Sequence, residues 1–129
     1  MHRFVLLRHE CPPDAGKPSH WDLMLEESGI LRTWQLDRLP ARWAEALGTP
    51  TGDQAPVHAL PLPDHRLVYL KYEGPLSDNR GTVSRCDAGI YRTTHREEQL
   101  WEFELAGAKI KGCAQLTCKE QEWLLEDHS

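Results

Sequence analysis

Residues 20–36, HWDLMLEESGILRTWQL, predict a β-hairpin, because two stretches of β-forming residues flank a polar Ser-Gly pair. Side chains along a strand point alternately to its two faces, so His20, Asp22 and Met24 share one face of the first strand. An imidazole beside a carboxylate on that face is either a pair of solvated surface groups or two ligands of one metal ion. Other residues of the chain decide between these interpretations.

Short segments of the same kind recur on both sides of this hairpin. Residues 10–19, with three prolines, predict a loop, residues 49–63 a loop or irregular edge, and residues 75–81 a turn. We expect residues 82–94 to form a second hairpin that folds at Asp87–Gly89. The predicted strand segments are residues 3–9, 20–27, 30–36, 65–74, 82–94, 99–107, 109–118 and 120–127.

One helix is expected, at residues 39–48, with Gly48 at the C-cap position. Its apolar residues fall on one face: Leu39, Trp43, Ala46 and Leu47. Short strands at regular spacing with a single helix predict an all-β fold, a compact small β-barrel of about eight short strands with one short helix. No repeat, low-complexity tract or linker divides the sequence, so residues 1–129 are expected to form a single domain.

The composition is ordinary for a globular protein, with 40% apolar and 27% charged residues. The net charge of −5 excludes a protein that coats nucleic acid without specificity, because such proteins neutralise phosphates with a basic surface. A local pocket with a few arginines remains compatible with one terminal phosphate. No apolar run is long enough to span a bilayer, and residues 1–10 are too short and too charged for a signal peptide, so we expect the cytoplasm.

In that reducing compartment the four cysteines are expected to be free thiols. The sequence has no CxxC pair, which argues against a zinc knuckle. Cys113 and Cys118 are near enough in sequence to share a metal ion, but their spacing does not favour it. The same interpretation covers all four residues: Cys11, Cys86, Cys113 and Cys118.

Five polar residues stand out for a small barrel. His9 ends the first predicted strand, and His20 and Asp22 open the next one after the loop, so the loop can bring the three together. Two imidazoles and a carboxylate suit Mn, Fe or Zn and leave coordination positions for water or substrate. His65 and Tyr69 are expected on one face of an extended segment, where a histidine can act as acid or base and a tyrosine can donate to developing charge.

Arginines accompany each candidate and are expected to bind phosphate: Arg8 next to His9, Arg66 next to His65, and Arg32 on the hairpin partner of the strand with His20. The alternative is that all these groups are ordinary solvated side chains, since His-x-Asp is a weak pattern. On that interpretation, His65 and Tyr69 are a partly buried pair at the barrel mouth.

Four segments in sequence order carry a family resemblance. Residues 20–34 (HWDLMLEESGILRTW) hold an HxDLRLE-type segment, and residues 64–74 (DHRLVYLKYEG) a histidine-bearing strand that ends in aromatic–Glu–Gly. Residues 80–91 (RGTVSRCDAGIY) contain Gly-Thr-Val and then Asp-x-Gly-aromatic. Residues 100–116 (LWEFELAGAKIKGCAQL) and 122–127 (EWLLED) read as closing strands with a late tryptophan. Together they resemble the 3′-phosphoesterase domain of bacterial non-homologous end-joining DNA ligase D.

The resemblance implies a compact β-barrel with an exposed, crescent-shaped active site. It also implies manganese-dependent removal of a 3′-terminal ribonucleotide or a 3′-phosphate from a DNA primer end, which leaves a 3′-hydroxyl. By position, the family's metal ligands fall on His9, His20 and Asp22, its second catalytic histidine on His65, and its tyrosine on Tyr69. The expected cofactor is therefore Mn, with Zn or another divalent metal as alternatives.

Three features depart from the family's pattern. A family arginine that contacts phosphate is replaced by Met24, whose thioether carries no charge and donates no hydrogen bond. The family's N-terminal arm with polar catalytic residues has no counterpart in the first residues, and the loop between His9 and His20 is longer than the family's usual spacing. We therefore expect a divergent, standalone member without an attached ligase or polymerase domain.

Three functional hypotheses follow. The first is a metal-dependent 3′-phosphoesterase in DNA repair, a monomer away from membranes that acts on the 3′ end of DNA or of an RNA–DNA primer, with ligase, polymerase or Ku-type repair proteins as partners. The second is a catalytically impaired module that binds metal and nucleic-acid ends. The third is a non-haem Fe(II) oxygenase, because His20, Asp22 and the distant His65 also fit an HxD…H facial triad.

Overall fold

The computed structural model describes residues 2–50 and 56–128. Part of the loop or edge predicted for residues 49–63 falls on residues 51–55 and so lies outside the described residues. The elements in chain order are β1 (His2–Glu10), β2 (His20–Glu27), β3 (Ile30–Leu36), α1 (Ala41–Leu47), β4 (Val57–His65), the 3-10 helix η1 (Leu67–Leu70), β5 (Gly74–Pro75), β6 (Thr82–Glu97), β7 (Leu100–Gly107), β8 (Lys111–Lys119) and β9 (Glu122–Asp127).

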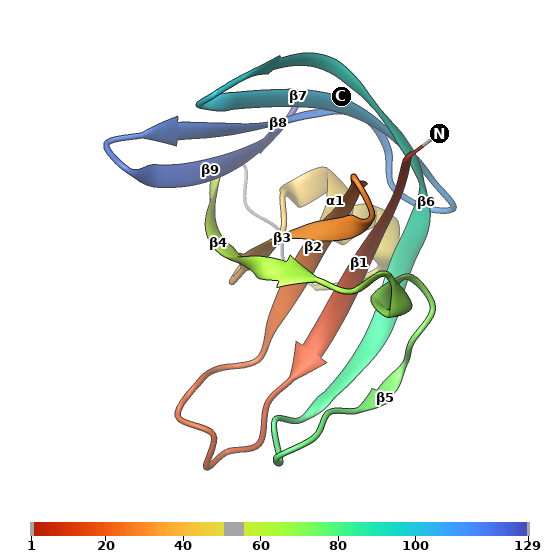
Figure 1. The fold of residues 1–129 in the computed structure, drawn as a ribbon, viewed down its shortest axis with the longest axis vertical. Coiled ribbons are helices and arrows are strands. Elements are labelled where there is room, and N and C mark those ends of the chain that lie inside the picture. The colour runs from red at the N-terminus through yellow and green to blue at the C-terminus, as the bar shows by residue number, and fades with distance from the viewer. Residues whose placement is uncertain (1, 51–55, 129) are drawn as a thin grey trace.

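The strands of the described residues form one antiparallel sheet in the order β1-β2-β3-β4-β9-β8-β7-β6-β5. Because β6 also pairs with β1, eight strands close into a barrel and β5 remains as an extra strand beside β6 (Figure 1). Closure gives the barrel strands neighbours on both sides and removes open sheet edges. The predicted all-β barrel with one short helix is confirmed.

The hairpin of β2 and β3 has the predicted boundaries. Its two-residue turn has positive φ at both positions, 51° at Ser28 and 83° at Gly29, which is the pattern of a type I′ turn. That turn matches the right-handed twist of the strands and fixes their register, with Asp22 opposite Gln35 and Leu23 opposite Trp34. The register in turn decides which face each side chain of β2 occupies.

The barrel interior is filled by apolar side chains from β1, from β2 and from the later strands. Phe4 and Leu6 of β1 and Leu23 and Leu25 of β2 are fully buried there. Aromatic rings join the two halves of the barrel, and the edge-to-face pair of Trp34 and Trp101 has its ring centroids 5.6 Å apart.

The helix α1 forms within the predicted range. Its Trp43, and Leu39 just before it, belong to the interior cluster. Gly48 ends the helix with φ 73°, the left-handed conformation typical of a C-cap glycine. The expectation that Ala46 lies on the apolar face is wrong. Ala46 is exposed and Ala44 is buried instead, because this short helix meets the barrel through Trp43 and its neighbour.

A second apolar cluster covers the opposite face of β1 and β2, outside the barrel. Val5 and Leu7 alternate with the inward residues of β1, and Met24 alternates with those of β2. The chain through η1 and β5 passes over this outer face and packs Leu70 and Tyr69 against it. The strand face that carries Met24 is therefore roofed by a second layer, and the candidate site lies beneath it.

Residues 65–74 are not the extended strand that the sequence predicts. β4 ends at His65, which is opposite Leu31 near the start of β3, so the chain has no further strand to pair with. It turns into η1, where Leu70 packs into the outer cluster. Burial of apolar side chains thus overrides the β-propensity of LVYL.

Residues 82–94 do not fold back at Asp87–Gly89 as expected, because β6 continues through them from Thr82 to Glu97. The buried Asp87 carboxylate accepts hydrogen bonds from three backbone N–H groups of the β7–β8 turn, those of Ala108, Lys109 and Ile110. At Gly89, a Cβ would lie 2.2 Å from the carbonyl oxygen of Ala106. The two residues of the Asp-x-Gly pattern therefore contact the β7–β8 turn and β7, and they do not form a turn themselves.

Within residues 49–63, the part from Val57 onward is a strand and not a loop. β4 pairs with β9 through Val57 and His58 and with β3 along the rest of its length. Pro61 and Pro63 lie beyond the two residues of β4 that pair with β9. On that side of β4 a proline, which has no N–H group, therefore interrupts no hydrogen bonds between strands.

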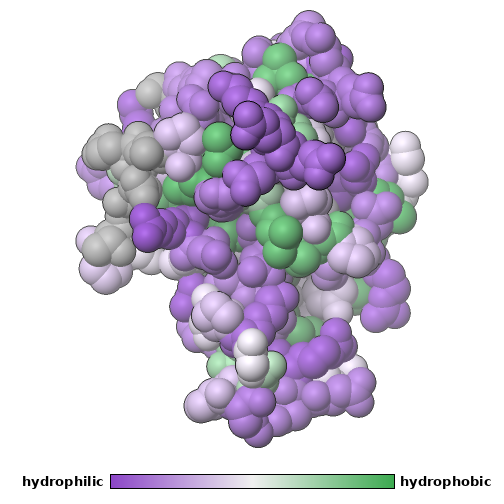
Figure 2. Space-filling model, turned by 90° about the vertical axis from the view of Figure 1, so that its left-hand side faces the viewer, coloured by the Kyte–Doolittle hydropathy of each residue, from purple (hydrophilic) through white to green (hydrophobic). Residues whose placement is uncertain are grey.

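The side of the molecule shown in Figure 2 is mainly hydrophilic, with apolar residues in small separate patches. Among the described residues, the large apolar side chains that are exposed lie on three different elements: Leu60, Val68 and Ile90. No helix in residues 2–50 and 56–128 is long and apolar enough to cross a membrane.

Candidate metal centre

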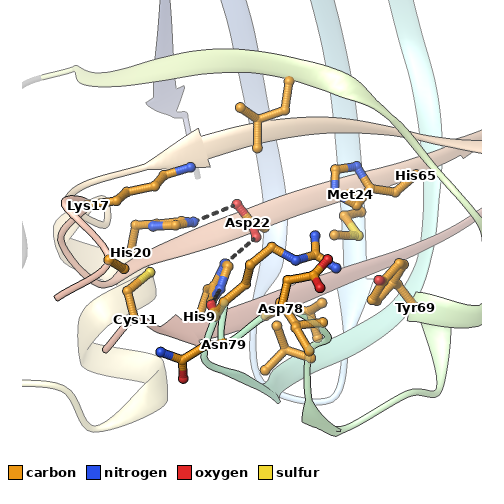
Figure 3. Close-up of a pocket in the computed structure, with 16 residues that line it drawn as sticks. His9, Cys11, Lys17, His20, Asp22, Met24, His65, Tyr69, Asp78 and Asn79 are labelled. Carbon is orange, nitrogen blue, oxygen red and sulfur yellow. Dashed lines mark hydrogen bonds and ion pairs between the residues drawn. The ribbon is translucent and has the colours of Figure 1, made fainter. Parts of the chain in front are cut away.

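A pocket of about 340 Å³ opens on the outer face of the β1–β2 pair, where both strands meet the loop between them (Figure 3). Its walls come from β1, β2, the end of β4, η1 and the turn before β6. The lining contains all five polar residues that the sequence singles out: His9, His20, Asp22, His65 and Tyr69. The expected convergence of these residues is therefore present.

Two imidazoles and one carboxylate meet at the floor of this pocket. His9 is opposite His20 in the β1–β2 ladder, and Asp22 is opposite Leu7, one diagonal step away. Nδ1 of His9 lies 3.7 Å from Oδ2 of Asp22, and Nε2 of His20 lies 3.3 Å from Oδ1. The strand ladder itself brings the three residues together, since the register places them in neighbouring rows.

Backbone carbonyls orient both imidazoles. Nε2 of His9 lies 2.7 Å from the carbonyl oxygen of Arg80, and Nδ1 of His20 lies 3.0 Å from that of Pro18. A carbonyl can only accept, so these two nitrogens carry the protons. In the neutral rings, the other two nitrogens hold lone pairs, and these are the atoms that face Asp22.

The Asp22 carboxylate is buried, and its Oδ1 has no hydrogen-bond partner. Burial acts to raise the pKa of this carboxyl, but hydrogen bonds and attraction from the rings of His20 and His9 in their protonated form together outweigh burial and hold the pKa below its usual value. The group is therefore an anion at neutral pH. The same carboxylate is the main cause that raises the pKa of His9.

When both rings are neutral, a lone-pair nitrogen of His9, one of His20 and the Asp22 carboxylate face one another with no proton between them. A buried anion of this kind is stabilised by a cation beside it, either a proton on His9 or a metal ion. Two imidazole nitrogens and a carboxylate oxygen are ligands that divalent transition metals accept, and carbonyl bonds to the outer nitrogens are the usual support for such ligands. The residues present fit a divalent cation.

The sequence model of the DNA ligase D 3′-phosphoesterase domain matches residues 13–118 of this chain. The chain belongs to this family. A search of curated proteins finds no match. The range that matches the phosphoesterase domain includes His20, Asp22, His65 and Tyr69, whereas His9 precedes it and joins them through the β1–β2 pairing.

His65 and Tyr69 line the wall of this pocket next to Met24 (Figure 3). Their rings meet edge to face with centroids 5.6 Å apart, although the segment between them is not extended. Nδ1 of His65 donates to the carbonyl oxygen of Pro63, 2.8 Å away, which leaves Nε2 as the acceptor nitrogen of the neutral ring. The η1 turn thus achieves the proximity that an extended strand was expected to give.

The three arginines expected to bind phosphate lie outside the lining of this pocket. Arg8, on the other face of β1 from His9, pairs with Glu10 and lies over the ring of Trp21. Arg32 bonds to Glu27 and Asp64. Arg66 lines a smaller adjoining depression that shares Tyr69, Leu76 and Arg80 with the main pocket.

Three pocket residues with useful chemistry were missed by the sequence analysis: Cys11, Lys17 and Arg80. Lys17 and Arg80 supply positive charge from the loop after β1 and from the turn before β6. Cys11 was detectable in principle, because it follows His9 by two residues and so shares its face of an extended chain. The two cations had no such signal, since loop side chains do not follow a strand period.

Proposed function

We propose that this chain is a metal-dependent 3′-phosphoesterase that removes a 3′-phosphate or a 3′-terminal ribonucleotide from DNA ends during repair. Membership of the DNA ligase D 3′-phosphoesterase family supports the reaction class. The observation that carries the metal dependence is Oδ1 of Asp22, a buried carboxylate oxygen without a hydrogen-bond partner, 3.3 Å from Nε2 of His20. A second lone-pair nitrogen, that of His9, faces the other carboxylate oxygen.

In this proposal His9, His20 and Asp22 hold the ion through Nδ1, Nε2 and the carboxylate. A bound divalent ion would polarise a phosphoryl oxygen and lower the pKa of a coordinated water. The family resemblance favours Mn²⁺. The carbonyl groups of Arg80 and Pro18 keep both imidazoles turned so that their free nitrogens face Asp22.

His65 and Tyr69 act on the phosphate from the opposite wall. With Nδ1 committed to the carbonyl of Pro63, Nε2 of His65 is free to take up a proton and donate it to the leaving oxygen. The Tyr69 hydroxyl, which lines the same pocket, donates to a non-bridging oxygen as charge develops there.

Positive charge for the phosphate comes from Lys17 and Arg80 in the pocket, with Arg66 in the adjoining depression. Together they replace the contact that is absent at Met24, which is buried beneath the pocket and carries no charge. Because the net charge of the chain is −5, the cations available to phosphate are limited to these few side chains, which suits a terminal phosphate instead of a long stretch of duplex.

We further propose that the protein acts in the cytoplasm as a monomer, on the 3′ end of DNA or of an RNA–DNA primer. Ligase, polymerase and Ku-type repair proteins are the proposed partners, because end trimming precedes sealing of the same break.

The test uses the full chain with Mn²⁺ and two labelled DNA primers, one that ends in a single ribonucleotide and one that ends in a 3′-phosphate. We expect conversion to a 3′-hydroxyl end by the unchanged protein and loss of conversion in His20→Ala. The matched control is His95→Ala on the exposed side of β6, which should retain full activity. Failure to trim either primer, or equal background activity in His20→Ala, would refute the catalytic proposal.

The same samples separate the two alternatives. Mn²⁺-dependent binding of the 3′-phosphorylated primer without turnover would identify a module that binds ends. Fe(II)- and oxygen-dependent turnover would identify the oxygenase, whose triad leaves out His9. The 3.7 Å approach of His9 to Asp22 favours His9 over His65 as the third ligand and so favours the phosphoesterase.

A further inference from the structure

We infer that Cys11 is a fourth protein ligand of the metal centre, and that its thiolate makes the site prefer Zn²⁺ or Co²⁺ to Mn²⁺. This inference rests on the metal dependence proposed above. It adds a ligand that the family resemblance does not assign, and it replaces the Mn²⁺ that the resemblance favours with ions that prefer sulfur.

The first support is geometric. The sulfur of Cys11 and a ring nitrogen from each of His9 and His20 all lie within 4.8 Å of one another. In Figure 3, Cys11 points toward the two imidazoles from the side away from Asp22. The thiol is half-buried and free, so a disulfide does not occupy it.

The second support is independent of the cysteine. The Asp22 side chain is only 6% exposed, lies next to both imidazoles of that cluster, and leaves Oδ1 without a hydrogen-bond partner. Tetrahedral zinc sites have metal–nitrogen bonds of about 2.0–2.1 Å, which places neighbouring donor atoms about 3.4 Å apart. The separation of Asp22 Oδ1 from Nε2 of His20, 3.3 Å, and that of Oδ2 from Nδ1 of His9, 3.7 Å, are close to that spacing.

Backbone contacts hold Cys11 in place beside the rings. Its N–H donates to Oγ of Ser19, 2.9 Å away, which closes the neck of the loop between β1 and β2. On the other side, a Cβ at Gly81 would lie 3.1 Å from the Cα of Cys11, so the turn before β6 packs directly on this residue. The thiol is therefore part of an ordered wall and not of a free loop.

A thiolate changes which ion the site retains. Sulfur is a softer ligand than the oxygen donors that suit Mn²⁺, and Zn²⁺ and Co²⁺ already bind nitrogen sites more tightly than Mn²⁺. On binding, a metal–sulfur bond forms and the thiol proton passes to water, with no oxidation or reduction. In the inferred centre, the sulfur of Cys11 joins a nitrogen from each of His9 and His20, and the Asp22 carboxylate beside both rings supplies the oxygen donor.

The test is Co²⁺ titration of the full chain, followed by absorption spectroscopy. We expect a sulfur-to-cobalt charge-transfer band in the near ultraviolet that Cys11→Ser abolishes. The matched control is Cys118→Ser, which changes another half-buried free thiol, on β8, and should keep the band. In parallel, Zn²⁺ affinity should fall in Cys11→Ser by more than the roughly 10- to 100-fold that loss of a supporting contact costs, while Mn²⁺ affinity changes less.

The outcomes separate this inference from the proposed function. Co²⁺ that binds without a sulfur band, or a band that persists in Cys11→Ser, overturns the Cys11 inference and leaves the centre of His9, His20 and Asp22 intact. Absence of any Co²⁺ binding overturns both. If Cys11→Ser does not fold, alkylation of the unchanged chain decides, since Zn²⁺ should protect Cys11 and leave the exposed Cys113 reactive. Equal alkylation of both thiols with and without Zn²⁺ would overturn the inference.

Discussion

Nε2 of His9 donates a hydrogen bond to the carbonyl oxygen of Arg80, 2.7 Å away, and this bond joins the end of β1 to the turn before β6. The next residue, Gly81, has φ 98°, and a Cβ there would lie 1.9 Å from the carbonyl oxygen of Glu10. The orientation of a proposed metal ligand therefore depends on a close approach of two backbones that only glycine permits.

Substitution of this glycine tests that dependence. Gly81→Ala should lower the free energy of unfolding by about 2 kcal/mol or more, because both the positive φ and the backbone contact oppose a Cβ. It should also weaken metal binding, since the turn that orients His9 must move. Urea denaturation and metal titration measure the two effects.

Gly29→Ala is the matched control, in the hairpin turn at the other end of β2. Its φ is 83° and a Cβ there would have nothing within 4 Å, so only the conformational cost of about 1 kcal/mol applies. Metal affinity equal to that of the unchanged protein is expected. If both variants bound metal normally, the link between Gly81 and His9 would be disproved.

Asp22→Asn removes the charge of the proposed ligand and keeps its size. At a metal concentration of a hundred times Kd, the unchanged protein should gain about 2.7 kcal/mol of stability on binding, and this gain should disappear in the variant. Thermal unfolding with and without Mn²⁺ or Zn²⁺ measures it. Asp37→Asn, on a residue that lies after β3 and outside the lining of the pocket, should keep the full gain; an equal loss there would mean that the gain does not report on the centre.

Met24→Arg restores the arginine of the family pattern at a position that is 1% exposed. An uncompensated buried charge should cost about 3 kcal/mol of stability, and inorganic phosphate in the pocket should recover part of it. Denaturation curves at increasing phosphate concentration test this expectation. Met24→Leu should change stability by less than about 1.5 kcal/mol and gain no phosphate response.

Glu26 gives a pH dependence that is unrelated to the centre. Hydrogen bonds from the Arg3 side chain hold the pKa of Glu26 at about 2, below its ordinary 4.5. A depressed folded-state pKa contributes stability above the unfolded value, and that stability is lost as the pH falls from about 4.5 to about 2. Glu26→Gln should flatten the stability curve across this window when unfolding is measured from pH 7 to pH 2. An unchanged slope would show that the Arg3 pair contributes nothing.

The sequence predicted the parts of the fold that depend on local geometry. The β2–β3 hairpin was placed correctly because the Ser-Gly turn fixes the register and the alternation assigns the faces. The continuous β6 was missed because Asp87 and Gly89 signal a turn locally, whereas their actual contacts are with the β7–β8 turn and with β7. No local pattern reveals those partners, which lie some twenty residues away.

For the site, strand alternation was sufficient to group His20 with Asp22, and His9 joins them through its pairing with His20. His65 and Tyr69 were placed in the right pocket for a wrong reason, since a 3-10 turn and not a strand brings them together. The positive charge was expected on Arg8 and Arg32, which carboxylates bind instead. Lys17 and Arg80 lie on loops, where sequence spacing carries no directional information.

The closure of the barrel by β6 has a consequence for the order of events during synthesis. All the proposed donor groups emerge from the ribosome within β1, β2 and the loop between them, but β6, the strand that flanks β1, follows more than half a chain later. A nascent chain that ends after η1 holds every donor and still lacks the Arg80 carbonyl that orients His9. Tight ion capture therefore has to wait for the long-range pairing of β6 with β1, so loading with metal is expected only after β6 has been synthesised.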